Sequence, residues 1–138
     1  MTFLLDTNTL IALAWSNHDQ HGQAKDWMKG IRSFATCPMT QGGFVRLSAN
    51  PAIGFPNGVA DAFHALDLLL GDERHTFWPD DVSFGEAEIR RQLIKSHAQV
   101  TDKYLVALAQ KRNGSLATFD KAVADAFADE SPLVTLIK

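Results

Sequence analysis

The stretch Thr2-Phe3-Leu4-Leu5-Asp6-Thr7-Asn8 opens the chain with a short apolar run that stops at an acidic residue. Apolar side chains then recur at helical spacing as far as Ala14. This order predicts a short buried strand over 2–5 and a helix directly after it. Asp6 therefore lies at the junction of a strand and a helix, where a carboxylate either caps the helix or belongs to a functional site.

The same alternation of short β-type runs and amphipathic segments continues along the chain. It is typical of parallel strands joined by helical crossovers, so the sequence predicts an α/β fold around a mainly parallel, five-stranded sheet. The strands are expected at 2–5, 34–37, 76–78, 115–119 and 133–137. The helices are expected after Asp6 and at 18–31, 40–50, 59–70, 84–94, 101–113 and 120–127, with Thr40, Thr101 and Asp120 as N-caps.

The composition excludes several classes of protein. The chain has 138 residues, 46% of them apolar, and a net charge of −3, which excludes a disordered protein. Cys37 is the single cysteine, so a disulfide scaffold is excluded as well. Without an apolar run of about 18 residues or a basic leader, we expect a cytoplasmic protein with no membrane association. No linker or repeat divides the chain, so 1–138 is expected to form a single domain.

Three acidic residues belong to one edge of the predicted sheet. Asp6 follows the first strand, Asp102 lies in the first turn of the helix at 101–113, and Asp120 follows the fourth strand. In a parallel α/β sheet the carboxyl ends of strands and the N-termini of helices share one edge, where ligands bind. Asp102 also continues the apolar stripe of Leu105 and Ala109, so we expect it to lean inward. If the first and fourth strands are neighbours, the three carboxylates converge.

Converging carboxylates repel one another unless a cation lies between them. The histidines are scattered and Cys37 is alone, so the ligands are oxygens, which selects Mg²⁺ or Mn²⁺. Such an ion generates hydroxide and offsets charge on a phosphate, so the expected chemistry is phosphodiester hydrolysis. Each acid also has a purely structural interpretation, as an N-cap for Asp6 and Asp120 or as a partner of the helix dipole for Asp102.

Taken together, Leu-Leu-Asp6-Thr7-Asn8, Val-Thr101-Asp102 and Ala-Thr118-Phe-Asp120 resemble the motifs of the PIN-domain ribonucleases, in particular the VapC toxins of bacterial toxin–antitoxin pairs. The resemblance spans essentially the whole chain and implies a three-layer α/β/α sandwich. It also implies a Mg²⁺- or Mn²⁺-dependent endoribonuclease that cuts RNA, forms a homodimer and is silenced by a cognate VapB-type antitoxin.

The resemblance further implies a role for each matched residue. Asp6 and Asp102 would bind the metal, and Asp120 would complete the catalytic site directly or through a water. The polar side chains that would orient these carboxylates are Thr7, Asn8 and Thr118.

One stretch departs from the family pattern. The family usually has a further acid in the helix after the second strand, whereas 40–46 reads Thr-Gln-Gly-Gly-Phe-Val-Arg. Gln41 offers a neutral oxygen there but no charge. We therefore expect one well-bound metal ion in preference to a pair.

Basic residues gather between 90 and 112, where six Lys and Arg side chains accompany one acid. They form either a solvated helix face or a rim of phosphate contacts. Lys103, within this run, and Arg46 are the candidates for phosphate binding. The dimer or antitoxin surface is expected on exposed parts of the first helices.

Two other functions remain open from the sequence. A PIN-like module that binds RNA or an antitoxin without cutting is compatible with the missing acid. A phospho-receiver signalling domain has a similar length and alternation, but the adjacent acids Asp80-Asp81 follow Trp78-Pro79 instead of the first strand. Metal-dependent RNA cleavage separates the nuclease from both alternatives.

Overall fold

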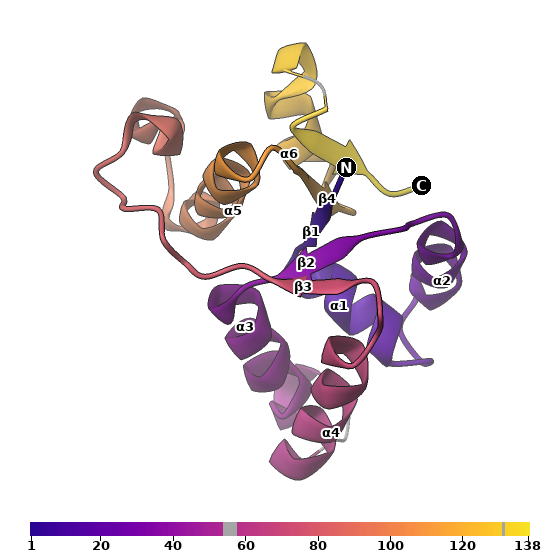
Figure 1. The fold of residues 1–138 in the computed structure, drawn as a ribbon. Coiled ribbons are helices and arrows are strands. Elements are labelled where there is room, and N and C mark those ends of the chain that lie inside the picture. The colour runs from indigo at the N-terminus through magenta and orange to yellow at the C-terminus, as the bar shows by residue number, and fades with distance from the viewer. Residues whose placement is uncertain (54–57, 131) are drawn as a thin grey trace.

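One parallel sheet organises the protein. The computed structural model describes residues 1–53, 58–130 and 132–138. Its strands lie in the order β3-β2-β1-β4-β5, and every pairing between them is parallel. The strands are β1 (Phe3–Leu5), β2 (Phe34–Thr36), β3 (His75–Phe77), β4 (Ser115–Thr118) and β5 (Val134–Leu136). The predicted parallel five-stranded sheet is confirmed, and β1 lies beside β4 at its centre (Figure 1).

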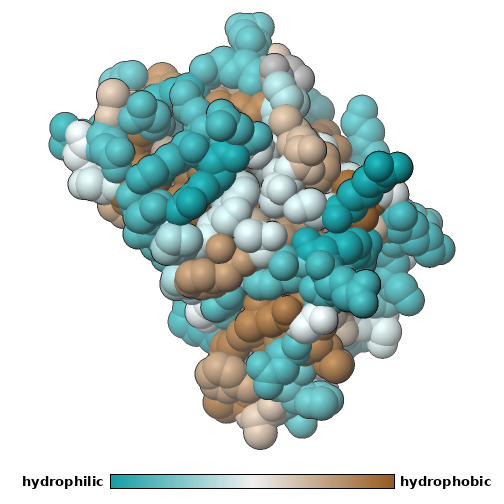
Figure 2. Space-filling model, viewed as in Figure 1, coloured by the Kyte–Doolittle hydropathy of each residue, from teal (hydrophilic) through white to brown (hydrophobic). Residues whose placement is uncertain are grey.

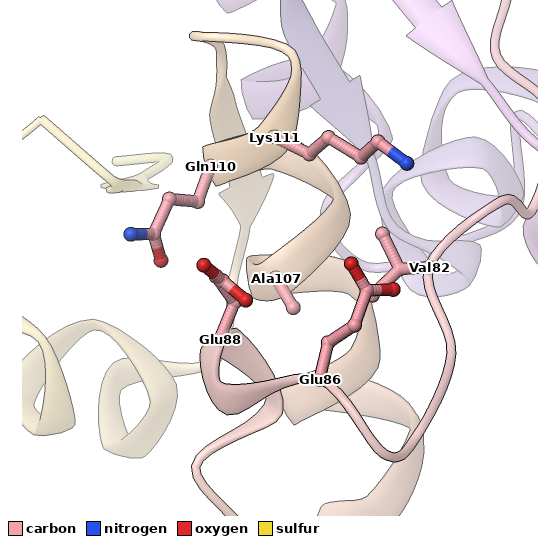
Figure 3. A pocket seen from close by; sticks show the side chains of 6 residues that line it. All are labelled: Val82, Glu86, Glu88, Ala107, Gln110 and Lys111. Atoms are coloured by element: carbon pink, nitrogen blue, oxygen red, sulfur yellow. The ribbon is translucent and has the colours of Figure 1, made fainter.

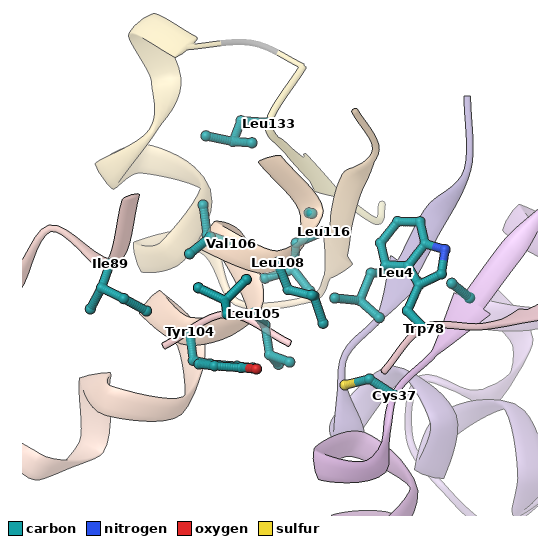
Figure 4. Close-up of a cluster of buried hydrophobic side chains, with 14 of the residues drawn as sticks. Leu4, Cys37, Trp78, Ile89, Tyr104, Leu105, Val106, Leu108, Leu116 and Leu133 are labelled. Carbon is teal, nitrogen blue, oxygen red and sulfur yellow. The ribbon is translucent and has the colours of Figure 1, made fainter. Parts of the chain in front are cut away.

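Helices cover both faces of this sheet (Figure 1). Because successive side chains on a strand point to opposite faces, Leu5 packs among the helices of one layer and Leu4 among those of the other. Figure 4 shows the second core, where Leu4 and Leu116 of the strands meet Leu105 and Leu108. The helices of the first layer are α1 (Thr7–Ala14), α2 (His21–Lys29), α3 (Pro38–Ser48) and α4 (Val59–Leu70); those of the second are α5 (Val100–Lys111) and α6 (Lys121–Ala126). The three-layer α/β/α sandwich is confirmed.

The helix predicted at 84–94 is wrong. This segment forms two 3₁₀ turns, Ala87–Ile89 and Arg91–Leu93. Between them Arg90 adopts a left-handed backbone conformation with a φ of 57°, which ends a right-handed helix. The guanidinium of Arg90 bonds the carboxylate of Glu130, so contacts with a distant segment accompany this turn.

Two of the three predicted N-caps are also wrong. Helix α3 begins at Pro38 with Cys37 as its N-cap, and the Thr40 hydroxyl accepts the Cys37 backbone N–H from within the first turn. Helix α5 begins at Val100, before Thr101, because a 3₁₀ turn over His97–Gln99 leads into it. Asp120 is confirmed as the N-cap of α6.

Several of the exposed apolar side chains belong to helix α4. Helix α1 is largely buried, whereas α4 exposes Val59, Phe63 and Leu68. Figure 2 shows apolar surface gathered in the lower part of the view, where α3 and α4 lie in Figure 1. Within the described residues, no helix has the length and apolar character needed to cross a membrane. Helix α4 thus offers apolar side chains to a partner, while a partner surface on the first helices stays a prediction.

Candidate active site

Asp6 is held at the centre of the carboxyl edge of the sheet. It follows β1 and caps α1, and its Oδ1 accepts the backbone N–H of Thr9 at 2.8 Å. Its Oδ2 accepts the hydroxyl of Thr118, from the end of the neighbouring β4, at 2.5 Å. Asp6 is only 7% exposed. Burial raises the pKa of its carboxyl group above the ordinary value, while the bonds from Thr118 and Thr9 act in the opposite direction.

Asp102 lies beside Asp6 and is electrostatically coupled to it. Burial, together with the smaller effect of the negative charges of Asp6 and Asp120, raises the pKa of Asp102 to about 6. Asp120 is exposed, and its Oδ1 caps α6 by accepting the backbone N–H of Ala122 at 2.9 Å. The three sequence-predicted acids thus share one edge of the sheet, and each is close enough to the next for its charge to matter.

A cavity of about 190 Å³ opens between α5 and α6 at this edge. Asp102, Lys103 and Asp120 bring the charged side chains to its wall. The other lining residues are Ala98, Gln99, Ala122, Val123 and Ala126. A narrow cavity lined by two carboxylates and one ammonium group is suited to a small, charged ligand.

The carboxylates fit a cation held by few protein ligands. Among the described residues, no three His, Cys, Asp or Glu side chains form a ready set of metal ligands. Mg²⁺, however, is commonly bound through one or two carboxylates and keeps several waters. Asp6 and Asp102 offer only oxygen atoms, and the repulsion between them disfavours ionisation without a cation. The residues therefore fit a hard divalent ion that is bound by two carboxylates better than an ion that is bound equally by all three.

The three predicted orienting residues have different positions. Thr118 donates its hydroxyl to Asp6 and accepts the backbone N–H of Asp120, so it joins two of the acids. Thr7 instead packs closely against Gly43 of α3. A Cβ atom placed on Gly43 would lie only 2.8 Å from the Thr7 Oγ1. Asn8 is exposed, and no described hydrogen bond joins it to the acids.

Thr9 is a residue of the site that the sequence analysis missed. Its backbone N–H bonds Asp6, and its hydroxyl donates to the Ala117 carbonyl oxygen of β4 at 3.2 Å. The signal was present, because an N-capping aspartate bonds the backbone two or three residues further on.

The stretch that lacks the family acid forms a neutral network. Gln41 donates from its amide nitrogen to the Thr36 hydroxyl at 3.0 Å, and this hydroxyl also bonds Nε2 of His75 at 2.7 Å. Gln41 thus brings no charge to the site. Arg46 is exposed in the last turn of α3, at the end remote from the carboxyl edge of the sheet, so the structure does not bring this candidate phosphate ligand to the acids.

Most of the basic run also lies away from the acids. Lys111 and Arg112, at the far end of α5, pair with Asp81 at 3.7 and 2.7 Å. Arg90 pairs with Glu130 at 2.5 Å. These three side chains form ion pairs within the protein, so they do not belong to a rim of phosphate contacts around the acids. Lys103 is the member of the run that lines the cavity.

A larger cavity, of about 250 Å³, lies further along α5 (Figure 3). Glu86, Glu88 and Lys111 line it, but none of the three candidate acids does. Two of its three charged groups already have partners in the protein, because Glu86 accepts the Ser83 backbone N–H and Lys111 bonds the Asp81 carbonyl oxygen. Size alone does not make this cavity the active site.

Comparison with known proteins identifies the family. The family model described as PIN domain matches residues 3–128. The chain is 43% identical over 130 residues to Ribonuclease VapC39 of Mycobacterium tuberculosis, covering 91% of this chain and 93% of that protein. It is 41% identical over 135 residues to Ribonuclease VapC29 of the same organism, covering 97% of each.

Solved structures share the fold at low sequence identity. The crystal structure of M. tuberculosis VapC20, a Sarcin-Ricin loop cleaving toxin, has a TM-score of 0.66 and 17% identity, and covers 90% of this chain and 94% of that one. VapBC2 from Rickettsia felis, bound to a DNA fragment from its promoter, has a TM-score of 0.62 and 16% identity, covering 99% and 97%. With matching fold, sequence and acidic edge, the chain belongs to the PIN-domain family.

Proposed function

We propose that this protein is a VapC-type endoribonuclease, the toxin of a type II toxin–antitoxin pair, that hydrolyses phosphodiester bonds in RNA with a bound Mg²⁺ or Mn²⁺. The relatives named as ribonucleases cover nearly the whole chain at above 40% identity, which supports the nuclease activity. The enzyme would act in the cytoplasm, which contains the RNA substrate. The single observation that supports the proposed site is the gathering of the three acids at one edge of the sheet, where Thr118 bonds both the Asp6 carboxylate and the Asp120 N–H and where Asp102 and Asp120 line one cavity.

Asp6 and Asp102 would hold the cation. Asp6 is already oriented by the Thr118 hydroxyl and the Thr9 N–H, and each carboxylate oxygen has a second lone pair to offer a metal. When bound, a divalent ion supplies an activated water and offsets negative charge on the reacting phosphate. Asp120, exposed at the cavity, holds a water against the same phosphate and completes the catalytic set.

A VapB-type antitoxin and a second copy of the chain are the proposed protein partners. One structural neighbour is a VapBC complex, which supports an antitoxin as partner. The exposed apolar side chains Val59, Phe63 and Leu68 of α4 would be covered in such an assembly.

One observation favours a second candidate, a PIN module that binds RNA without cutting it. Gln41 brings no charge where the family pattern usually has an acid, so the site holds a cation with fewer negative charges. The experiment below distinguishes the two functions.

Purified protein is incubated with total RNA in Mn²⁺ or in EDTA, beside the variants Asp6→Asn and Asp125→Asn. Asn can still cap α1 but loses the charge, so Asp6→Asn is expected to stop cleavage while the protein stays folded by circular dichroism. Asp125 is an exposed acid paired with Lys121 on α6, and Asp125→Asn is expected to cleave normally. Cleavage that survives in Asp6→Asn would overturn the proposed site; RNA binding without cleavage by the wild type would support the inert module.

A further inference from the structure

Lys103 is a lysine inside the protein. It lies in the first turn of α5, next to Asp102, and is only 6% exposed. Within the described part of the chain, no carboxylate lies within ion-pair distance of its ammonium group. Its ammonium group lies 5.1 Å from the ring centroid of Phe127, and its charge acts on the carboxylate of Asp102, the preceding residue, without forming an ion pair with it. Lysine is rarely so buried without a paired anion, so an anion from outside the protein would complete the surroundings of Nζ.

Two cationic side chains, those of Arg90 and Lys103, contact the ring of Phe127, and they differ in their other partners. The guanidinium carbon of Arg90 lies 5.0 Å from the ring centroid, and Arg90 also has the carboxylate of Glu130. Lys103 contacts the same buried ring without such a carboxylate. The aromatic face attracts the ammonium group but does not neutralise its charge.

Lys103 is also directed toward the candidate active site. Side chains on a helix lean toward its N-terminus, and the N-terminus of α5 lies at the carboxyl edge of the sheet. Lys103 accordingly lines the same cavity as Asp102 and Asp120. One positive charge therefore stands in the wall of the cavity that would receive the reacting phosphate.

The net charge at this edge suits a positive side chain such as Lys103. The three acids carry three negative charges when Asp6, Asp102 and Asp120 are ionised, and one divalent ion offsets two of these charges. Gln41 supplies no acid that would help to hold a second ion. The site would then still repel the negative charge of an RNA phosphate, unless Lys103 supplies the third positive charge.

We propose, building on the ribonuclease function above, that Lys103 is the phosphate-binding residue of this site. Its Nζ donates hydrogen bonds to a non-bridging oxygen of an RNA backbone phosphate in the cavity between α5 and α6. The buried ring of Phe127 holds the ammonium group in place. Lys103 thereby supplies the positive charge that a second divalent ion would otherwise bring.

The test is Lys103→Met, with Lys111→Met as matched control. Both replace a lysine of α5 by an uncharged side chain of similar length, but Lys111 pairs with Asp81 at the far end of the helix. Binding of a fluorescent single-stranded RNA is measured by anisotropy in the Asp6→Asn background, so that cleavage does not interfere. Lys103→Met is expected to weaken binding about tenfold, the worth of one charge-assisted hydrogen bond.

Two further readouts separate a lost phosphate contact from a damaged fold. The slope of log affinity against log salt should become shallower by about 0.7 in Lys103→Met, as for one lost contact to a single strand. In the otherwise wild-type chain without RNA, calorimetry should show tighter Mn²⁺ binding by Lys103→Met, because a cation near Asp102 has been removed. A misfolded variant would bind both Mn²⁺ and RNA more weakly.

Equal RNA affinities of Lys103→Met and Lys111→Met, or weaker Mn²⁺ binding by Lys103→Met, would overturn the assignment of Lys103. Neither result touches the proposed function, which depends on the loss of cleavage in Asp6→Asn. Conversely, a wild-type protein that fails to cleave RNA but binds it through Lys103 would refute the nuclease and leave the phosphate site standing.

Discussion

Asp102 and Asp72 are acids of one chain with opposite environments. Asp72 lies before β3, at the amino edge of the sheet, and accepts from the Nε and Nη2 atoms of Arg74 at 3.0 and 2.8 Å. These bonds lower the pKa of Asp72 to about 2. At the carboxyl edge, burial and two neighbouring acids raise the pKa of Asp102 to about 6.

The difference shows what each edge of the sheet is for. Among the described residues, no Lys or Arg forms an ion pair with Asp6, Asp102 or Asp120, although Asp72 and Asp81 both have such partners. Unpaired, partly buried acids cost stability, and a protein keeps them where a ligand restores the balance. Asp72 at the amino edge is thus paired within the protein, whereas the acids of the carboxyl edge are not, which agrees with the proposed cation site.

The sharpest way to break this comparison is to neutralise one acid at each edge. Asp102→Asn should lower Mn²⁺-dependent cleavage by more than about 100-fold, since a proposed metal ligand is lost. The same change should raise the free energy of unfolding of the metal-free protein by about 1 kcal/mol, after allowance for solvent screening, because a disfavoured charge is removed.

Asp72→Asn serves as the reciprocal control. It should leave the cleavage rate unchanged and lower the free energy of unfolding by about 1–2 kcal/mol, because the bonds with Arg74 lose their charge. Urea unfolding and a cleavage assay check both variants. If Asp102→Asn were less stable than the wild type, the carboxyl edge would be a structural network like the other one.

A smaller effect is expected from the hydroxyl that supports Asp6. Thr118→Val removes the bond to Asp6 and the acceptor for the Asp120 N–H while keeping the side-chain shape. Loss of such a supporting bond typically costs 10–100-fold in metal affinity, so about that loss of Mn²⁺ affinity is expected by calorimetry. Thr118→Ser keeps the hydroxyl and should retain most of the affinity; equal losses in both variants would point to packing instead.

The smallest expected effect is a difference between Asp102 and Asp72 in how each makes the stability of the protein depend on pH. The folded pKa of Asp102, about 6, lies above its unfolded value of 3.8, so the folded state binds more protons between these values. The stability of the metal-free protein should therefore fall as the pH rises from about 4 through 6, with Asp6 acting in the same direction. For Asp72 the sign is reversed, and its contribution is lost as the pH falls from about 4 toward 2.

Urea unfolding of the metal-free protein across this range checks both signs. Asp102→Asn should flatten the slope between pH 4 and 6, and Asp72→Asn should flatten the loss of stability below pH 4. An unchanged slope above pH 4 in Asp102→Asn would mean that the pKa of Asp102 is not raised in the folded protein.

Local patterns predicted the fold well. The apolar runs placed every strand to within about a residue or two, as expected for boundaries read from periodicity. Asp120 was also found as an N-cap, because capping depends on the next two or three residues. The segment at 84–94 failed, because its apolar spacing suits a helix while Arg90, bound to Glu130, takes a left-handed conformation.

Only part of the candidate site could be predicted from the sequence. Asp6, Asp102 and Asp120 were singled out because each sits at the end of a strand or the start of a helix. Their proximity, however, depended on the first and fourth strands being neighbours, which no local pattern states. Lys103 and Arg46 were both candidates for phosphate binding from the sequence, and the structure brings only Lys103 to the cavity, buried beside Phe127.

The sequence by itself determined the order of strands and helices and the identity of the acids at their ends, because these depend on spacings of two to four residues. The tertiary structure decided which charges meet and which are paired. It did so through the order of strands, which places Thr118 of β4 against Asp6 of β1, and through the packing around α5, which brings Lys111 to Asp81 and places Lys103 at the cavity. Charge interactions depend on distance and solvent, and both are set by the packing of segments far apart in the chain.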